Sequence, residues 1–292
     1  MSSKGAIAIM CLIVTAAVAA GVLYLRSHPA DLPAVLSPRP VVQEDSSKED
    51  ERFRVAPVDE PAMPLTPEEA KKAGFIPMKG GGYVFERKDG VEGVAVPGTV
   101  LMNRGVVELF ACGVGGKEHE SVLRIECDIQ SFDMALTGCG FRRGRLPKDL
   151  RDKGVEQGER LLLFVQWKTK DERVVTHRAE DLLLHVKREA PMARTGWTFV
   201  GGWVDVVDPT STPKERKTYK VLAAAASRSL VTTWRDPSTL FDNPNPDAVD
   251  DTLYAANFMV APPSGTRVLV IVRAPSGRER EEIAKAEEAL SK

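Results

Sequence analysis

The chain has 292 residues, which is long enough for one large domain or two small ones. Its hydrophobic content of 43% is sufficient to build a buried core. The formal net charge of −1 gives no electrostatic reason to expect nucleic acid or an acidic partner, so any binding chemistry must be sought in local segments.

The N-terminal segment predicts a membrane anchor. Residues 5–25 carry no charge and lie between Lys4 and Arg26. A helix of this length crosses about 30 Å of hydrocarbon. Residues 1–26 are therefore predicted to be a single-pass transmembrane anchor or signal segment, with the N-terminus in the cytoplasm and the body outside it. The alternative is a secreted product, cleaved near Ala17–Ala19, because secretory signals have a shorter apolar region of about 7–15 residues.

The remainder divides into three parts. Residues 27–64 are rich in proline and charge and poor in apolar side chains, and such a composition cannot bury a core. This segment is predicted to be a disordered acidic tether. A mostly β domain is predicted over residues 65–276, followed by a charged helical tail with little to bury over residues 277–292.

Short strands separated by turn residues dominate the predicted domain. Short helices are expected after Thr66, where Pro67 and two acids follow a capping residue, and over residues 131–136. The predicted strands are 83–86, 91–96, 106–112, 122–129, 161–167, 174–177, 182–186, 197–207, 219–226, 230–234 and 268–272. This pattern favours a mainly β fold, with α+β as the alternative, built as a sandwich or open barrel of many short strands with a few short helices.

The most informative stretch is a glycine-rich turn followed by a clean strand. Apolar and polar residues alternate over residues 122–129, which indicates a half-buried strand. The glycines of residues 113–116 favour a turn that joins it to the strand 106–112 as a β-hairpin. Within the second strand, Glu118 and Glu120 would share one face and His119 the other, so the three cannot converge on one metal ion.

Part of this stretch resembles a known family. Gly116–Leu123, with the sequence GKEHESVL, is similar to the signature of the YdjY-type family of uncharacterised bacterial proteins. The similarity continues in three further segments, which are 197–202, the Asp-, Asn- and Pro-rich loop 240–251, and 255–266. It extends over residues 75–273 and implies an exported or membrane-anchored envelope protein, but no activity. Gly202 stands where the family has serine, which weakens any role for a serine there.

The polar residues before this strand are candidate binding residues, namely Lys117, Glu118, His119, Glu120 and Ser121. A histidine between two glutamates is a possible acid–base pair, but the preferred interpretation is a local hydrogen bond that fixes the hairpin. Ser121 lacks the Gly-x-Ser-x-Gly context of an activated nucleophile. We therefore predict no catalytic residue, no metal ligand and no cofactor.

Cys112, Cys127 and Cys139 would lie outside the cytoplasm, where they allow at most one internal disulfide and leave one thiol. Small buried hydrophobic residues are the default interpretation for all three. The loop 240–251 resembles a calcium site superficially, but it lacks the glycine and glutamate that an EF-hand requires. Asparagine, aspartate and proline commonly build turns, which is the preferred interpretation.

These patterns favour a non-enzymatic envelope binding or assembly module, attached to the membrane through residues 5–25 and bound to an unidentified envelope protein or ligand. The alternative is a metal- or thiol-dependent enzyme or redox protein that uses His119 with Glu118 or Glu120 and a nearby cysteine. A pocket that unites His119, a cysteine and an acid would favour the enzyme. A histidine alone on an open edge would favour the binding module.

Overall fold

The computed structural model describes residues 51–152, 158–212 and 215–292. The predicted membrane segment 1–26 and residues 27–50 of the predicted tether lie outside the described residues. Within the described ranges, no helix combines the length and the apolar character that a membrane span needs.

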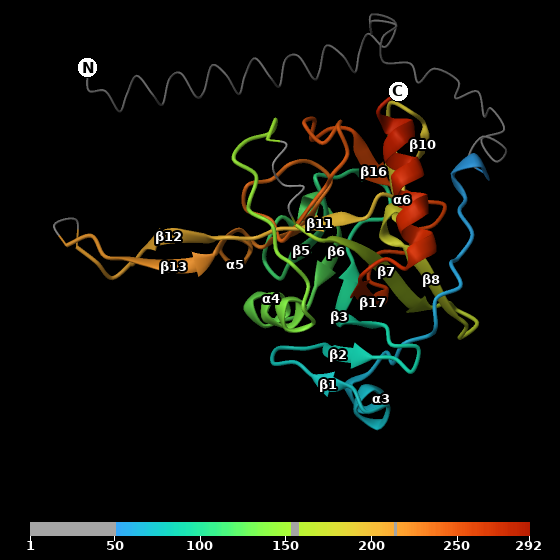
Figure 1. Cartoon of the computed structure of the whole chain (residues 1–292), viewed down its shortest axis with the longest axis horizontal. Coiled ribbons are helices and arrows are strands. Elements are labelled where there is room, and N and C mark those ends of the chain that lie inside the picture. The colour runs from blue at the N-terminus through green and yellow to red at the C-terminus, as the bar shows by residue number, and fades with distance from the viewer. Residues whose placement is uncertain (1–50, 153–157, 213–214) are drawn as a thin grey trace, which may run out of the picture. The chain divides into compact units, whose positions relative to one another are not determined.

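The centre of the domain is a closed barrel of eight strands (Figure 1). In spatial order these are β3 (Glu92–Val100), β17 (Arg267–Arg273), β7 (Arg160–Lys168), β11 (Trp197–Phe199), β15 (Phe241–Asp242), β14 (Ser229–Thr232), β5 (Leu109–Gly113) and β6 (Ser121–Ile125). Pairing of Gly98 with Ile125 and of Val100 with Leu123 joins β3 to β6 and closes the ring. The mainly β class is confirmed, and closure removes the free edges that an open barrel would have.

Smaller elements surround the barrel. β1 (Ile76–Pro77) and β2 (Tyr83–Glu86) extend the sheet from β3, and β8 (Val174–Arg178) extends it from β7. A second sheet contains β10 (Ala190–Pro191), β9 (Leu183–His185), β16 (Tyr254–Ala256) and β4 (Gly105–Val106), and a third contains only β12 (Trp203–Val207) and β13 (Thr218–Leu222). The helices are α3 (Pro67–Lys72), α4 (Ile129–Gly138), α5 (Ala223–Ser227) and α6 (Gly277–Leu290), with 3-10 turns η3 (Glu51–Phe53), η4 (Glu118–Glu120) and η6 (Ala179–Leu182).

Apolar side chains on both faces of the central strands explain the continuous apolar run in β7. Leu161, Leu163 and Val165 pack in the large cluster that all eight barrel strands share. Leu162 and Phe164 point to the other face, in a second cluster with residues of β2, α3 and α6. A strand covered on both faces has no need of polar alternation, and the strand predicted at 161–167 is confirmed as β7.

The strands β5 and β6 pair in parallel, so the predicted hairpin of 106–112 and 122–129 is wrong. Leu109 lies opposite Ser121 and Gly113 opposite Ile125, which requires the chain to run back along β5 before β6 begins. A five-residue strand is short enough for this return, since it spans about 13 Å. The second strand also ends at Ile125, because Asp128 caps the N-terminus of α4.

The folded domain begins before residue 65. The backbone N–H and C=O of Met63 bond to the Gln166 side chain at 2.8 and 2.7 Å. The Glu60 carboxylate receives two hydrogen bonds from Arg273, at 3.0 and 2.7 Å, and one from Arg87 at 2.5 Å. Residues 51–64 were assigned to the tether on composition, but these few side chains find specific partners that composition does not reveal.

The C-terminal tail is a helix, as expected, and it packs on the barrel. Ser276 and Glu279 form a reciprocal capping box that starts α6. Ile283 is buried in the outer apolar cluster, and Glu279 accepts two hydrogen bonds from Arg273 at 2.9 and 2.8 Å. The helix therefore packs on the domain, although Ile283 is the one residue of α6 that it buries.

Candidate functional site

The glycine-rich turn before β6 is shaped by Arg228. Gly115 has a φ of +72°, and a Cβ there would lie 2.2 Å from the Arg228 guanidinium. That guanidinium donates to the Gly115 carbonyl at 2.8 Å. The left-handed backbone favours glycine here, and a Cβ would displace the Arg228 side chain, so the turn has a structural explanation.

Each of the five candidate residues at this turn has a local partner, at 3.3 Å or less for all but His119. Lys117 Nζ lies 2.5 Å from Glu108 and 3.2 Å from Glu120. Glu118 accepts the Gly115 N–H at 2.9 Å, which lowers the pKa of its carboxyl. It also lies 3.3 Å from Arg124. The Ser121 hydroxyl donates to the Lys117 carbonyl at 2.7 Å. These contacts hold the return from β5 to β6.

His119 lies on an open surface. Its side chain is 79% exposed, and its Nε2 lies 3.4 Å from Glu120 Oε1. The structure therefore places it beside an acid on the surface of the described part of the chain. Within the described ranges, no group of three histidine, cysteine or acidic side chains is arranged to hold a metal ion.

The three cysteines of the body are free thiols. Burial raises the pKa of Cys127 to about 12, and it also raises the pKa values of Cys112 and Cys139. The thiolate is the nucleophilic form of cysteine, and burial disfavours it. Cys112 is buried, as expected of a small hydrophobic residue, whereas Cys127 and Cys139 are only partly buried.

The loop 240–251 is held by its own polar side chains. Asn245 accepts from Thr195 Oγ1 at 2.9 Å, and Asp247 accepts from His185 Nε2 at 2.8 Å. The backbone N–H of Arg188 donates to the other ring nitrogen of His185 at 3.2 Å. With both ring nitrogens engaged, the histidine fixes the loop, in keeping with the preferred interpretation of this segment as a turn.

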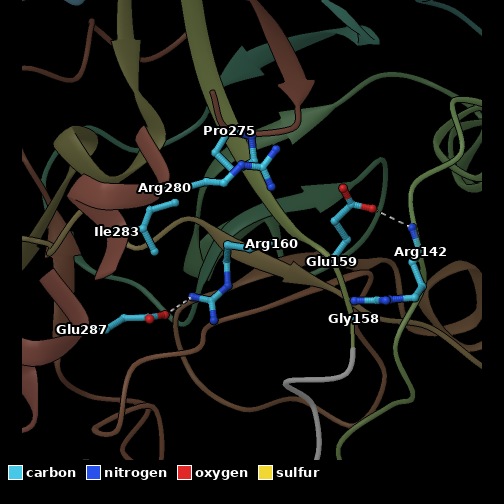
Figure 2. Close-up of a pocket in the computed structure, with 8 residues that line it drawn as sticks. All are labelled: Arg142, Gly158, Glu159, Arg160, Pro275, Arg280, Ile283 and Glu287. Atoms are coloured by element: carbon cyan, nitrogen blue, oxygen red, sulfur yellow. Dashed lines mark hydrogen bonds and ion pairs between the residues drawn. The ribbon is translucent and has the colours of Figure 1, made fainter. Parts of the chain in front are cut away.

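A pocket lined by arginines was not predicted (Figure 2). It has a volume of about 420 Å³ and lies between α6, the start of β7 and the segment that follows α4. Its lining residues are Arg142, Gly158, Glu159, Arg160, Pro275, Arg280, Ile283 and Glu287. Figure 2 shows that the three arginines come from three separate elements.

Each wall of this arginine pocket is fixed by the fold. Arg280, Ile283 and Glu287 share one face of α6, with the buried Ile283 holding that face against the barrel. The Arg142 N–H donates to Glu159 Oε2 at 2.9 Å, and the Glu159 N–H donates to the Arg142 carbonyl at 2.8 Å. These reciprocal bonds hold the segment after α4 beside the start of β7.

At the bottom of the arginine pocket, Gly158 lies close to the backbone of β11. A Cβ on Gly158 would lie 2.1 Å from the Phe199 carbonyl oxygen, so only glycine fits at this point. The Phe199 N–H also donates to the Glu159 carbonyl at 2.8 Å. The pocket is therefore built on rigid sheet backbone.

The side chains that line the arginine pocket give it an excess of positive charge. Arg160 pairs with Glu287 at 2.9 Å, and Glu159 already accepts a backbone N–H. In the described part of the chain, no carboxylate forms an ion pair with Arg142 or Arg280. Guanidinium groups present forked donors that match carboxylate, phosphate and sulfate oxygens. The arrangement can hold an oxyanion. The two carboxylates that line the pocket, Glu159 and Glu287, already accept hydrogen bonds or pair with an arginine.

No sequence signal marks this pocket, because its arginines stand at positions 142, 160 and 280 and share no motif. Only the tertiary packing of α6 brings them together. No family model, curated protein or solved structure matches this chain. The function is therefore argued from the site itself.

Proposed function

We propose that this chain is a membrane-anchored extracytoplasmic binding protein that holds an oxyanion-bearing small ligand in the arginine pocket and performs no chemistry on it. The observation that carries the proposal is the pair of guanidinium groups, Arg142 and Arg280, that have no carboxylate partner among the described residues yet line the same pocket as Arg160. The anchor over residues 5–25 and the resemblance of Gly116–Leu123 to YdjY-type envelope proteins support the location.

Electrostatics supports a binding role. Ligand binding to an unpaired guanidinium group costs little free energy, because no existing ion pair must be broken. A hydrogen bond to a charged group contributes about 1.5–3 kcal/mol. Exposure of Arg142 and Arg280 lowers this contribution toward the bottom of that range, because solvent screens the charges. Binding without chemistry is favoured because neither a cysteine nor a histidine is among the described residues that line the pocket.

The test is calorimetric titration of the full chain, reconstituted in nanodiscs, with inorganic phosphate, pyrophosphate and citrate. We expect at least one of these anions to bind, and Arg280→Ala and Arg142→Ala each to weaken that binding about tenfold, which corresponds to about 1.4 kcal/mol.

Arg278→Ala is the matched control. Arg278 lies on the same helix, is 88% exposed and pairs with Glu282 at 3.1 Å, outside the pocket. Its removal should leave anion affinity unchanged. Absence of binding by the wild type, or undiminished binding by the Arg142→Ala and Arg280→Ala double variant, would refute the proposed function.

A further inference from the structure

A two-stranded arm extends away from the barrel (Figure 1). It consists of β12 and β13, which pair from Trp203 with Leu222 to Val207 with Thr218. Across the described residues, neither strand pairs with any other. The arm therefore has a free edge along each strand. A two-stranded ribbon is marginally stable alone in water, so an arm of this kind gains from an additional strand.

One face of the arm is entirely apolar. The opposed pairs Val204–Val221 and Val206–Tyr219 place four apolar side chains on the same side of the ribbon. Tyr219 is 49% exposed and Val204 36%, so the face is uncovered. The other face carries the cross-strand ion pair of Asp205 and Lys220 at 3.3 Å, between the pairs Trp203–Leu222 and Val207–Thr218.

The two strands differ in charge. Asp205 and Asp208 lie on β12 and just after it, whereas Arg216, Lys217 and Lys220 lie just before β13 and on it. A two-fold pairing of two copies would place like edges together, and like charges opposite each other are destabilising. Four apolar side chains also fall short of the roughly 800 Å² per partner of a stable interface. Both facts argue against a second copy as the occupant.

We propose that the free edge of β13 binds an extended segment of a partner protein in which apolar and acidic residues alternate. A third strand would place every second residue beside Tyr219 and Val221 on the apolar face. The residues between them would lie beside Thr218 and Lys220 on the charged face. In this mode of binding, main-chain hydrogen bonds supply affinity, and the alternation of apolar and acidic residues in the bound segment supplies specificity.

The test measures fluorescence anisotropy of labelled, end-blocked peptides with the full chain in nanodiscs. The probe has four Val-Glu repeats. One control peptide replaces Glu by Lys, and a second keeps the Val-Glu sequence but carries N-methyl groups on alternate residues, which remove donors from one edge. We expect the Val-Glu peptide to bind at least tenfold more tightly than either control.

A charge-reversal variant distinguishes a loss of specific binding from unfolding of the arm. Lys220→Glu should lose the Val-Glu peptide and gain the Val-Lys peptide, a switch that an unfolded arm cannot produce. Lys168→Glu reverses an exposed lysine at the end of β7 and should change neither affinity. Tyr219→Ser should weaken Val-Glu binding about tenfold.

Equal affinity for the Val-Glu and Val-Lys peptides would overturn the proposal, as would equal binding of the N-methylated peptide. Two other occupants are also checked. A dimer that Tyr219→Ser abolishes in sedimentation, or arm-dependent binding to phosphatidylglycerol vesicles without peptide binding, would each overturn it. Anion binding in the arginine pocket is measured separately and does not depend on the arm.

Discussion

Replacement of Asp242 by asparagine is expected to remove a pH-dependent weakness of the fold. The carboxylate of Asp242 is completely buried, and Arg235 Nε lies 3.3 Å away. Burial raises the pKa of this carboxyl from 3.8 to about 7, and the positive charge of Arg235 opposes the increase. Folding therefore favours the protonated acid.

The sign and size follow from linkage. The stabilising contribution of the protonated acid is fully present below pH 3.8 and is lost as the pH rises through about 7. At about 1.4 kcal/mol per pKa unit, the complete loss is about 4 kcal/mol. Between pH 5 and pH 8, wild-type protein should lose about 3 kcal/mol of its unfolding free energy through this group.

The assay is urea unfolding of the wild type and Asp242→Asn at pH 5, 6, 7 and 8. The variant should approach or exceed the stability of the wild type at pH 8, and the difference between the two should shift by about 3 kcal/mol across the series. Asp236→Asn is the control, because Asp236 accepts hydrogen bonds from Ser229 and Ser238 and should lose stability at every pH. A constant difference between wild type and Asp242→Asn would refute the reasoning.

Three further substitutions test contacts described above by thermal unfolding. His119→Ala should change stability by less than about 0.5 kcal/mol, because the ring is exposed. Glu60→Ala should cost about 3–5 kcal/mol, because it removes a partner of the buried Arg273. Gly115→Ala should cost more than Gly90→Ala, since both have positive φ but only a Cβ at Gly115 would displace the Arg228 side chain from its hydrogen bond.

Each of these has a control or a contrary outcome. Glu51→Ala removes an acid that is 58% exposed and should be nearly neutral, in contrast to Glu60→Ala. Equal losses at the two positions would show that Glu60 is not a buried partner. A large loss for His119→Ala would restore the earlier expectation that this histidine fixes the turn. Equal losses of stability for Gly115→Ala and Gly90→Ala would show that the contact with Arg228 does not contribute to stability.

Local sequence patterns predicted the individual elements well. The apolar run at 161–167 is β7, and the capping pattern after Thr66 is α3, because both depend on neighbouring residues only. The stretch 197–207 was predicted as one strand, but it divides into β11 and β12 on either side of Gly201 and Gly202. Glycines within a strand interrupt it where another backbone or side chain approaches closely.

Long-range features could not be predicted in the same way. Barrel closure depends on pairing of Gly98 with Ile125, and the parallel arrangement depends on where β6 meets β5. The sequence around each strand carries no information on its partner. The arginine pocket likewise depends on α6 packing over the start of β7, which the charged composition of residues 277–292 conceals.

Arg273 joins the two ends of the domain mechanically. Its guanidinium holds Glu60 on the N-terminal side and Glu279 in the first turn of α6, and the bond pair of Met63 with Gln166 lies just after Glu60. A pulling force applied along the N-terminal segment would therefore reach β17 and β7, in the middle of the sheet, before it reached β1 and β2 at its margin. Central strands resist such a load by shearing many hydrogen bonds together, whereas a marginal strand would peel away one bond at a time.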